Sequence, residues 1–108
     1  MPNLLRLSDA EVQSRCTALP GWELREDALH RELTFRDFVE AFSLMTLVAF
    51  MAERMGHHPE WTNVYNRLTI RLTTHDVGGV SENDLTMAEE ISRLYERINT
   101  AATLSSRA

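Results

Sequence analysis

The residues best suited to chemistry in this chain are histidines, three of which are placed where they can meet. His57 and His58 stand directly before Pro59, and His75 follows a run of alternating apolar and polar residues. Histidine has an ordinary pKa of about 6.5, so it gives or takes a proton near neutral pH. The histidine pattern therefore favours general acid–base catalysis.

Two extended segments, residues 61–64 and 67–74, predict how the histidines come together. Tyr65–Asn66 between them predicts a tight turn, because asparagine tolerates the left-handed conformation. If the strands pair across that turn, the antiparallel register places residues 57–58 opposite residues 73–74. The three histidines would then gather at the open end of this hairpin.

Two neighbours fit the same chemistry. Glu53 lies one helical turn before His57, where it is placed either to orient His57 or to bind a donor edge of a ligand. A helix C-terminus stabilises positive charge, which suits His57 as a general acid. Trp61 offers a flat apolar surface to an aromatic ligand. Together these residues suit proton transfer around a planar heterocycle.

Each of these residues also has a structural interpretation that involves no catalysis. Adjacent histidines before a proline also occur at a solvated helix end, Glu53 as a surface charge, and Trp61 in a core. A catalytic zinc site is the sharper alternative, because three histidines can ligate that metal. We disfavour it because adjacent histidines do not readily point at one ion. No glycine-rich phosphate loop and no serine or cysteine nucleophile motif occurs.

The element order is helix, hairpin, helix, hairpin, helix. Three serine or threonine residues precede an acidic residue at capping-box spacing: Ser8 with Glu11, Thr34 with Asp37, and Ser81 with Asp84. The first helix would run from Ser8 to Pro20–Gly21, and the second would end near His57, since a residue before proline leaves the helical conformation. Alternation predicts strands at residues 22–24 and 28–34 as well. The simplest packing is an antiparallel sheet with helices on one face.

The second helix is apolar on two sides. One stripe at helical spacing comprises Phe38, Ala41, Phe42, Met45, Ala49 and Ala52, and a second set comprises Leu44, Leu47 and Met51. A helix apolar on two faces is usually buried on both. In a chain of this size we expect the second set to form a subunit interface.

Composition sets broad limits on the protein. Residues 1–108 predict one domain, and the formal net charge of -5 disfavours binding to nucleic acid. The longest apolar run, residues 44–52, is far below the roughly 20 residues that span a bilayer. Cys16 is the one cysteine, so no intrachain disulfide is possible, and we expect it to be a small buried or half-buried hydrophobe. That cysteine usage and the absence of a signal-peptide pattern predict a cytoplasmic protein.

At this point the sequence resembles a known family. The spacing Glu53-x-x-x-His57-His58-Pro59, followed by Tyr65, His75 and Asp84, is similar to the signature of pterin-4a-carbinolamine dehydratases. The segments 57–66 and 73–79 are especially close to it. The resemblance extends from about Trp22 to the last helix.

The resemblance implies an α+β fold with a four-stranded antiparallel sheet and three helices on one side. It also implies a homodimer or homotetramer, which agrees with the two-faced second helix. The reaction would be dehydration of 4a-hydroxytetrahydrobiopterin to quinonoid dihydropterin, which recycles the cofactor of aromatic amino-acid hydroxylases. The family needs no metal and no other cofactor for this reaction.

The resemblance also implies roles for individual residues. His57 would be the general acid for the departing hydroxyl, and His75 would serve the other stereoisomer. His58 would be catalytic as well, binding the substrate and assisting proton transfer. Glu53 would hold the pterin, and Trp61 would wall the pocket. The backbone of Thr73 and Thr74 would offer hydrogen bonds. For Asp84, Pro59 and Tyr65 a structural role stays open.

A binding or regulatory role is the remaining alternative. Some animal members of the family stabilise the dimer of a homeodomain transcription factor through a helix surface, and the second helix of this chain is available for such a partner. Retention of Glu53, His57, His58 and His75 argues against a purely structural protein, because a scaffold has no use for that proton-transfer set.

Overall fold

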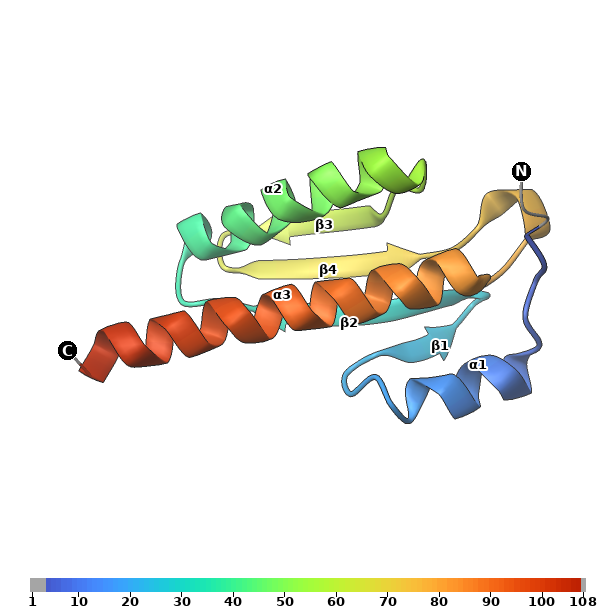
Figure 1. Cartoon of the computed structure of the whole chain (residues 1–108), viewed down its shortest axis with the longest axis horizontal. Coiled ribbons are helices and arrows are strands. Elements are labelled where there is room, and N and C mark those ends of the chain that lie inside the picture. The colour runs from blue at the N-terminus through green and yellow to red at the C-terminus, as the bar shows by residue number, and fades with distance from the viewer. Residues whose placement is uncertain (1–3, 108) are drawn as a thin grey trace.

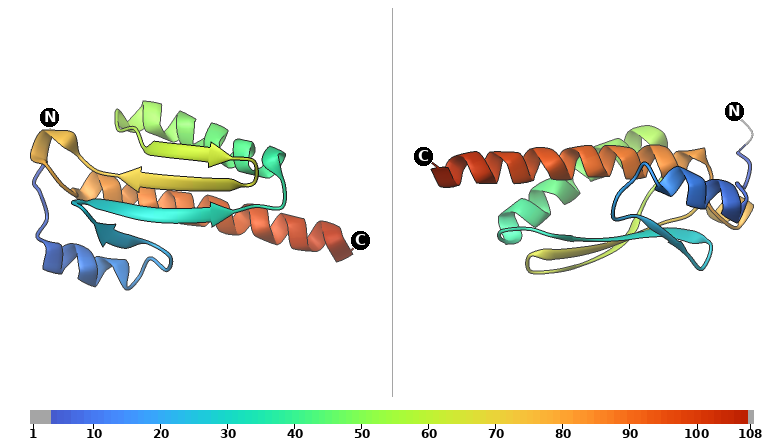
Figure 2. Two further views of the ribbon diagram at one scale, coloured as in Figure 1. Left: turned by 180° about the vertical axis from the view of Figure 1, so that it is seen from behind. Right: turned by 90° about the horizontal axis from the view of Figure 1, so that it is seen from below.

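The computed structural model describes residues 4–107, with side chains described as far as residue 101 (Figure 1). Its helices are α1 (Asp9–Cys16), α2 (Phe38–Met55) and α3 (Glu82–Arg107), with a short 3-10 helix, η1 (His75–Val77). The strands β1 (Glu23–Arg25), β2 (Ala28–Thr34), β3 (Glu60–Val64) and β4 (Arg67–Leu72) form one antiparallel sheet in the order β1-β2-β4-β3. The helices lie on one side of the sheet (Figure 2). This arrangement confirms the predicted α+β class.

The hairpin of β3 and β4 has the predicted turn and register. Val64 pairs with Arg67, but the residue of the turn with a positive φ, 52°, is Tyr65 and not Asn66 as the prediction assumed. The ladder ends where Glu60 pairs with Arg71, so the expected pairing of residues 57–58 with residues 73–74 does not form. The physical reason is Pro59, which has no N–H to continue the ladder.

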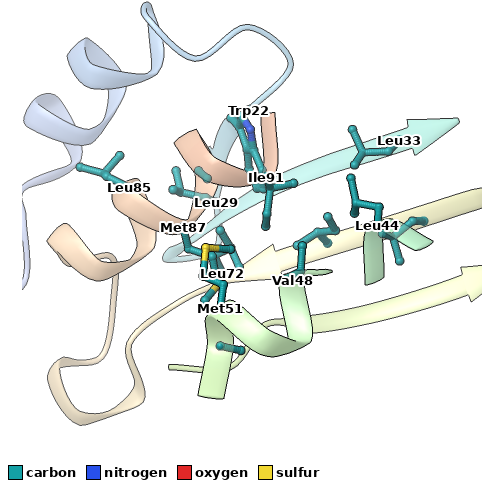
Figure 3. Close-up of a cluster of buried hydrophobic side chains, with 14 of the residues drawn as sticks. Trp22, Leu29, Leu33, Leu44, Val48, Met51, Leu72, Leu85, Met87 and Ile91 are labelled. Atoms are coloured by element: carbon teal, nitrogen blue, oxygen red, sulfur yellow. The ribbon is translucent and has the colours of Figure 1, made fainter. Parts of the chain in front are cut away.

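The core lies between the sheet and the two long helices (Figure 3). Alternate residues of β4 point toward the helices, and all three of them are fully buried: Leu68, Ile70 and Leu72. Side chains of α2 and α3 meet them there, including Leu44, Val48, Met51, Met87 and Ile91. Burying one such side chain contributes roughly 1.5–3 kcal/mol, so this layer fixes both helices on the sheet.

The fold divides both apolar sets of α2. Leu44 and Met51, expected at a subunit interface, are buried in the core, whereas Leu47 of the same set is exposed as expected. In the first stripe both phenylalanines are exposed, whereas Ala41 and Ala52 are buried. Both sets repeat at helical spacing, so the periodicity cannot tell which of them faces the sheet. Only the packing against β4 decides this.

Two further expectations concern local chemistry. Asp37, rather than Thr34, caps α2: its carboxylate accepts a hydrogen bond from the Glu40 amide at 2.9 Å, while Thr34 ends β2.

Cys16 is half-buried, and burial raises the pKa of its thiol, which keeps it protonated at neutral pH. No helix in the described part of the chain is long and apolar enough to cross a membrane.

Candidate active site

The histidines are placed by the way α2 ends. Gly56 adopts the left-handed conformation with φ of 63°, and the amide of His57 donates to the carbonyl of Ala52 at 3.1 Å. A glycine takes this conformation without steric cost, so it reverses the chain directly after the helix. The result is that His57 turns into the protein while His58 stays at the surface.

His57 is bound to a buried carboxylate. Its Nε2 lies 2.6 Å from Oδ1 of Asp84, whose side chain has no exposed surface, while the His57 side chain is 10% exposed. Oδ2 of Asp84 accepts from the Thr74 hydroxyl at 2.7 Å and from the Ser81 amide at 2.9 Å. Because the Thr74 proton is used there, the Ser81 hydroxyl donates to Thr74, 2.7 Å away. This buried network joins α2, β4 and α3.

Asp84 also lies in the first turn of α3. The N-terminus of a helix stabilises negative charge, which suits a carboxylate at that place. The expected capping-box pair of Ser81 and Asp84 is half realised, since the carboxylate accepts from the Ser81 amide while the Ser81 hydroxyl binds Thr74. The capping pattern thus marked a residue that holds His57 in place.

The other two histidines have exposed carboxylate partners. Nε2 of His58 lies 2.7 Å from Oε2 of Glu53, and these side chains are 61% and 79% exposed. Nε2 of His75 lies 3.0 Å from Oε1 of Glu60, and these side chains are 78% and 46% exposed. Of the two roles expected for Glu53, orienting His57 is wrong: Glu53 binds His58, because the left-handed turn carries His57 toward α3. Its role in binding a ligand stays a prediction.

A polar hollow of about 260 Å³ lies among these residues. All three histidines line it, together with Leu4, Gly56, Thr73, Thr74, Asp76 and Asn83. The predicted meeting of His57, His58 and His75 beside residues 73–74 is thus found, although no strand pairing produces it.

The carboxylates determine which ring nitrogen is free to act. An ionised carboxylate only accepts hydrogen bonds, so Nε2 of His57 and Nε2 of His58 donate to Asp84 and Glu53. The carboxylate 3.0 Å from Nε2 of His75 favours a proton on that nitrogen as well, as an ion-pair contact. Nδ1 is then the nitrogen that takes up or releases a proton when the ring changes charge. The hollow therefore presents three imidazoles suited to general acid–base chemistry.

Three predicted site residues lie away from this hollow. Trp61 lines a separate apolar hollow of about 360 Å³ with Phe42, Met45, Thr46, Ala49, Phe50 and Glu53. Tyr65 is exposed at the turn between β3 and β4, and Pro59 separates His58 from the start of β3. Glu53 lines the apolar hollow and also binds His58, so it lies between the two hollows.

Sequence reasoning missed several residues of the site. Leu4 and Asn83 line the hollow, and neither spacing nor residue type distinguishes them. Asp76 also lines it and lies in the segment 73–79 that resembles the family signature, but it was given no role. Glu60 was detectable, because the register that places His75 near the hairpin end also places Glu60 opposite Arg71.

The described residues contain no group of three or more histidine, cysteine, aspartate or glutamate side chains arranged to hold a metal ion. The three Nε2 atoms face three different carboxylates rather than one another. The zinc alternative therefore has no ligand cluster in this part of the chain.

Comparisons with a family model and with related proteins all indicate the same family. A family model described as "Pterin 4 alpha carbinolamine dehydratase" matches residues 5–94. A protein of Prochlorococcus marinus (strain MIT 9303), provisionally named a pterin-4-alpha-carbinolamine dehydratase, is 53% identical over 82% of this chain and 92% of its own length. A relative of the same provisional name from Solibacter usitatus (strain Ellin6076) is 49% identical over 82% of this chain and 94% of its own.

A solved structure supports the same relationship. The crystal structure of a transcriptional coactivator/pterin dehydratase from Brucella melitensis superposes with a TM-score of 0.82 at 39% identity, covering 83% of this chain and 98% of that one.

Proposed function

The chain belongs to the pterin-4a-carbinolamine dehydratase family and is a hydro-lyase with that activity, and from this premise we propose how it acts. It dehydrates 4a-hydroxytetrahydrobiopterin to quinonoid dihydropterin by histidine general acid–base catalysis in the polar hollow. The observation that carries this proposal is that three histidines line one hollow, each paired through Nε2 with its own carboxylate.

The chemistry asks for a proton donor at the departing oxygen. Hydroxide leaves a saturated carbon slowly unless that oxygen is protonated as the bond breaks, and a positioned acid contributes about 10² to 10⁴-fold. The lone pair on N5 of the pterin drives water out, and the proton on N5 must then be taken by a base. A neutral imidazole accepts that proton, and an imidazolium supplies the first one.

We assign His57 as the general acid for the 4a-hydroxyl. Support comes from its burial and from Asp84, which holds its ring and would stabilise the imidazolium. His75 takes the same role for the other stereoisomer. His58 binds the substrate at the exposed wall of the hollow, with Glu53 behind it.

The remaining predicted contacts differ in their support. Thr73 and Thr74 line the hollow, which fits hydrogen bonds from their backbone to the pterin. The Thr74 hydroxyl is committed to Asp84, its N–H donates to the Gly79 carbonyl, and its own carbonyl accepts from the Val77 and Gly79 amides. The backbone of Thr73 is therefore the better supported of the two contacts. Trp61 stays a predicted pocket wall, and a substrate in the polar hollow would touch it only by reaching past His58 and Glu53.

In the cell this reaction would recycle tetrahydropterin for aromatic amino-acid hydroxylases, and we propose that it takes place in the cytoplasm. No metal or cofactor takes part. A hydroxylase reaction consumes tetrahydropterin and releases the 4a-hydroxy compound. The dehydratase would convert that compound to quinonoid dihydropterin and water, and a separate two-electron reduction would then regenerate tetrahydropterin.

The test is the activity of the purified, chelator-treated protein. Freshly made 4a-hydroxytetrahydrobiopterin is followed by ultraviolet absorbance against its spontaneous dehydration. Acceleration without metal supports the proposal and contradicts the zinc alternative. A folded protein that gives only the spontaneous rate would overturn the proposed activity and favour a binding role.

We further propose that the chain forms a homodimer or homotetramer through the outer side of α2. Large apolar side chains are exposed there: Phe38, Val39, Phe42, Leu47 and Phe50. They border two surface hollows of about 360 and 440 Å³. A contiguous exposed apolar surface of this kind marks an interaction site. Light scattering should give a multiple of the 12.4 kDa chain mass, and Phe50→Glu should reduce it. A monomeric wild type would contradict self-association.

A further inference from the structure

Glu60 is a surface carboxylate held by two different side chains. Its Oε1 lies 3.0 Å from Nη1 of Arg71 and 3.0 Å from Nε2 of His75. Arg71 also reaches the carbonyl of Glu26, at 3.5 Å. One carboxylate oxygen therefore joins a guanidinium on β4 to the imidazole that begins η1.

The strand register produces this arrangement. Glu60 is the first residue of β3 and pairs directly with Arg71 in the ladder, so their side chains lie on the same face of the sheet. That face is opposite the core, because the neighbouring Ile70 and Leu72 point toward the helices. His75 lies shortly beyond the end of β4, which brings its ring back over the pair.

His75 needs such support more than His57 does. Its side chain is 78% exposed, whereas His57 is enclosed by the protein and bound to a fully buried carboxylate. An exposed imidazole samples several rotamers and both neutral tautomers unless a partner selects one. The carboxylate of Glu60 selects the tautomer with the proton on Nε2, and Arg71 restrains the carboxylate.

We propose that Glu60 is the positioning residue of His75, and that Arg71 fixes Glu60 in turn. The proposal rests on the dehydratase function proposed for the polar hollow. Glu60 is absent from the residues that line the hollow, so it acts through the histidine and not by touching substrate. Exposed ion pairs add little to stability, so the consequence is expected in catalysis rather than in folding.

The experiment is a double-mutant cycle on the full chain. Dehydration of the 4a-hydroxytetrahydrobiopterin stereoisomer assigned to His75 is measured for Glu60→Gln, His75→Ala and the double variant, and kcat and KM are determined separately for each protein. Glu60→Gln should lower kcat by on the order of tenfold, with KM within about twofold, because a misaligned catalytic group slows the chemical step. In the His75→Ala background the same change should have no further effect.

Two controls separate positioning from a general change in charge or stability. Glu32→Gln removes another exposed carboxylate on the same face of the sheet, one strand beyond β4, and should leave kcat unchanged. Arg71→Gln should reproduce part of the Glu60→Gln effect, again only when His75 is present. Thermal unfolding of every variant shows whether the fold is retained.

A spectroscopic readout tests the proposal independently of turnover. Long-range ¹H–¹⁵N spectra of the His75 ring should show the Nε2–H tautomer in the wild type and a larger Nδ1–H fraction in Glu60→Gln. An unchanged tautomer, or an equal loss of kcat from Glu60→Gln with and without His75, would overturn the positioning role. Absence of dehydration by the wild type would instead overturn the proposed function, and the spectra would still decide whether Glu60 holds His75.

Discussion

The two sides of the histidine cluster are built differently. On the inner side, His57 binds Asp84, which also accepts from Thr74 and Ser81, and all four residues are buried. On the outer side, His58 binds Glu53 through an exposed pair.

The comparison shows how burial changes what one hydrogen bond does. A buried polar group that loses its partner costs about 1–3 kcal/mol, whereas an exposed ion pair is typically worth about 0–1 kcal/mol. The inner side therefore couples catalysis to folding, and the outer side can vary in chemistry without loss of the fold.

The largest expected effect is on turnover, at His57. His57→Ala should lower kcat for dehydration by about 10²-fold or more, because the acid at the departing hydroxyl is lost. His30→Ala is the matched control, since His30 lies on β2 with its Nε2 at 3.1 Å from the Arg25 carbonyl, outside the hollow. Near-wild-type turnover in a folded His57→Ala protein would remove His57 from its assigned role.

The next largest effect is on stability, at Asp84. Asp84→Ala leaves the donors of His57, Thr74 and Ser81 without their buried acceptor, so the free energy of unfolding should fall by about 3 kcal/mol. Urea denaturation measures this change. Asp76→Ala, an exposed carboxylate beside the same hollow, should change the free energy of unfolding by less than about 0.5 kcal/mol. Equal effects from the two variants would contradict the contrast between the inner and outer sides.

The smallest effect is expected on the outer side, at Glu53. Glu53→Gln should leave the free energy of unfolding within about 0.5 kcal/mol of the wild type, because the pair with His58 is exposed. It should still raise KM several-fold, because His58 is then less well oriented to bind the pterin. Calorimetry and steady-state kinetics on the same preparation separate these outcomes, and a large loss of stability would show that this pair is structural.

The exposed apolar side of α2 is a third kind of surface, distinct from both sides of the cluster. It carries phenylalanines where the hollow carries polar groups. We expect substitutions there to change the assembly state before they change the chemistry of the histidines.

Much of this protein is determined by local sequence. The element order, the turn at Tyr65–Asn66 and the helix start at Ser8 follow from alternation, turn residues and capping, which act within a few residues. The gathering of His57, His58 and His75 was also predicted, although the register used to predict it extends only to the pair of Glu60 and Arg71.

Tertiary structure decided which partner each residue takes. Glu53 has helical spacing to His57 but binds His58, because the left-handed turn at Gly56 rotates the two histidines apart. Asp84 is distant in sequence from His57 and meets it only because α3 packs beside α2 on the same sheet. The side of α2 that faces the core was open for the same reason: periodicity defines a face, and only packing gives that face a neighbour.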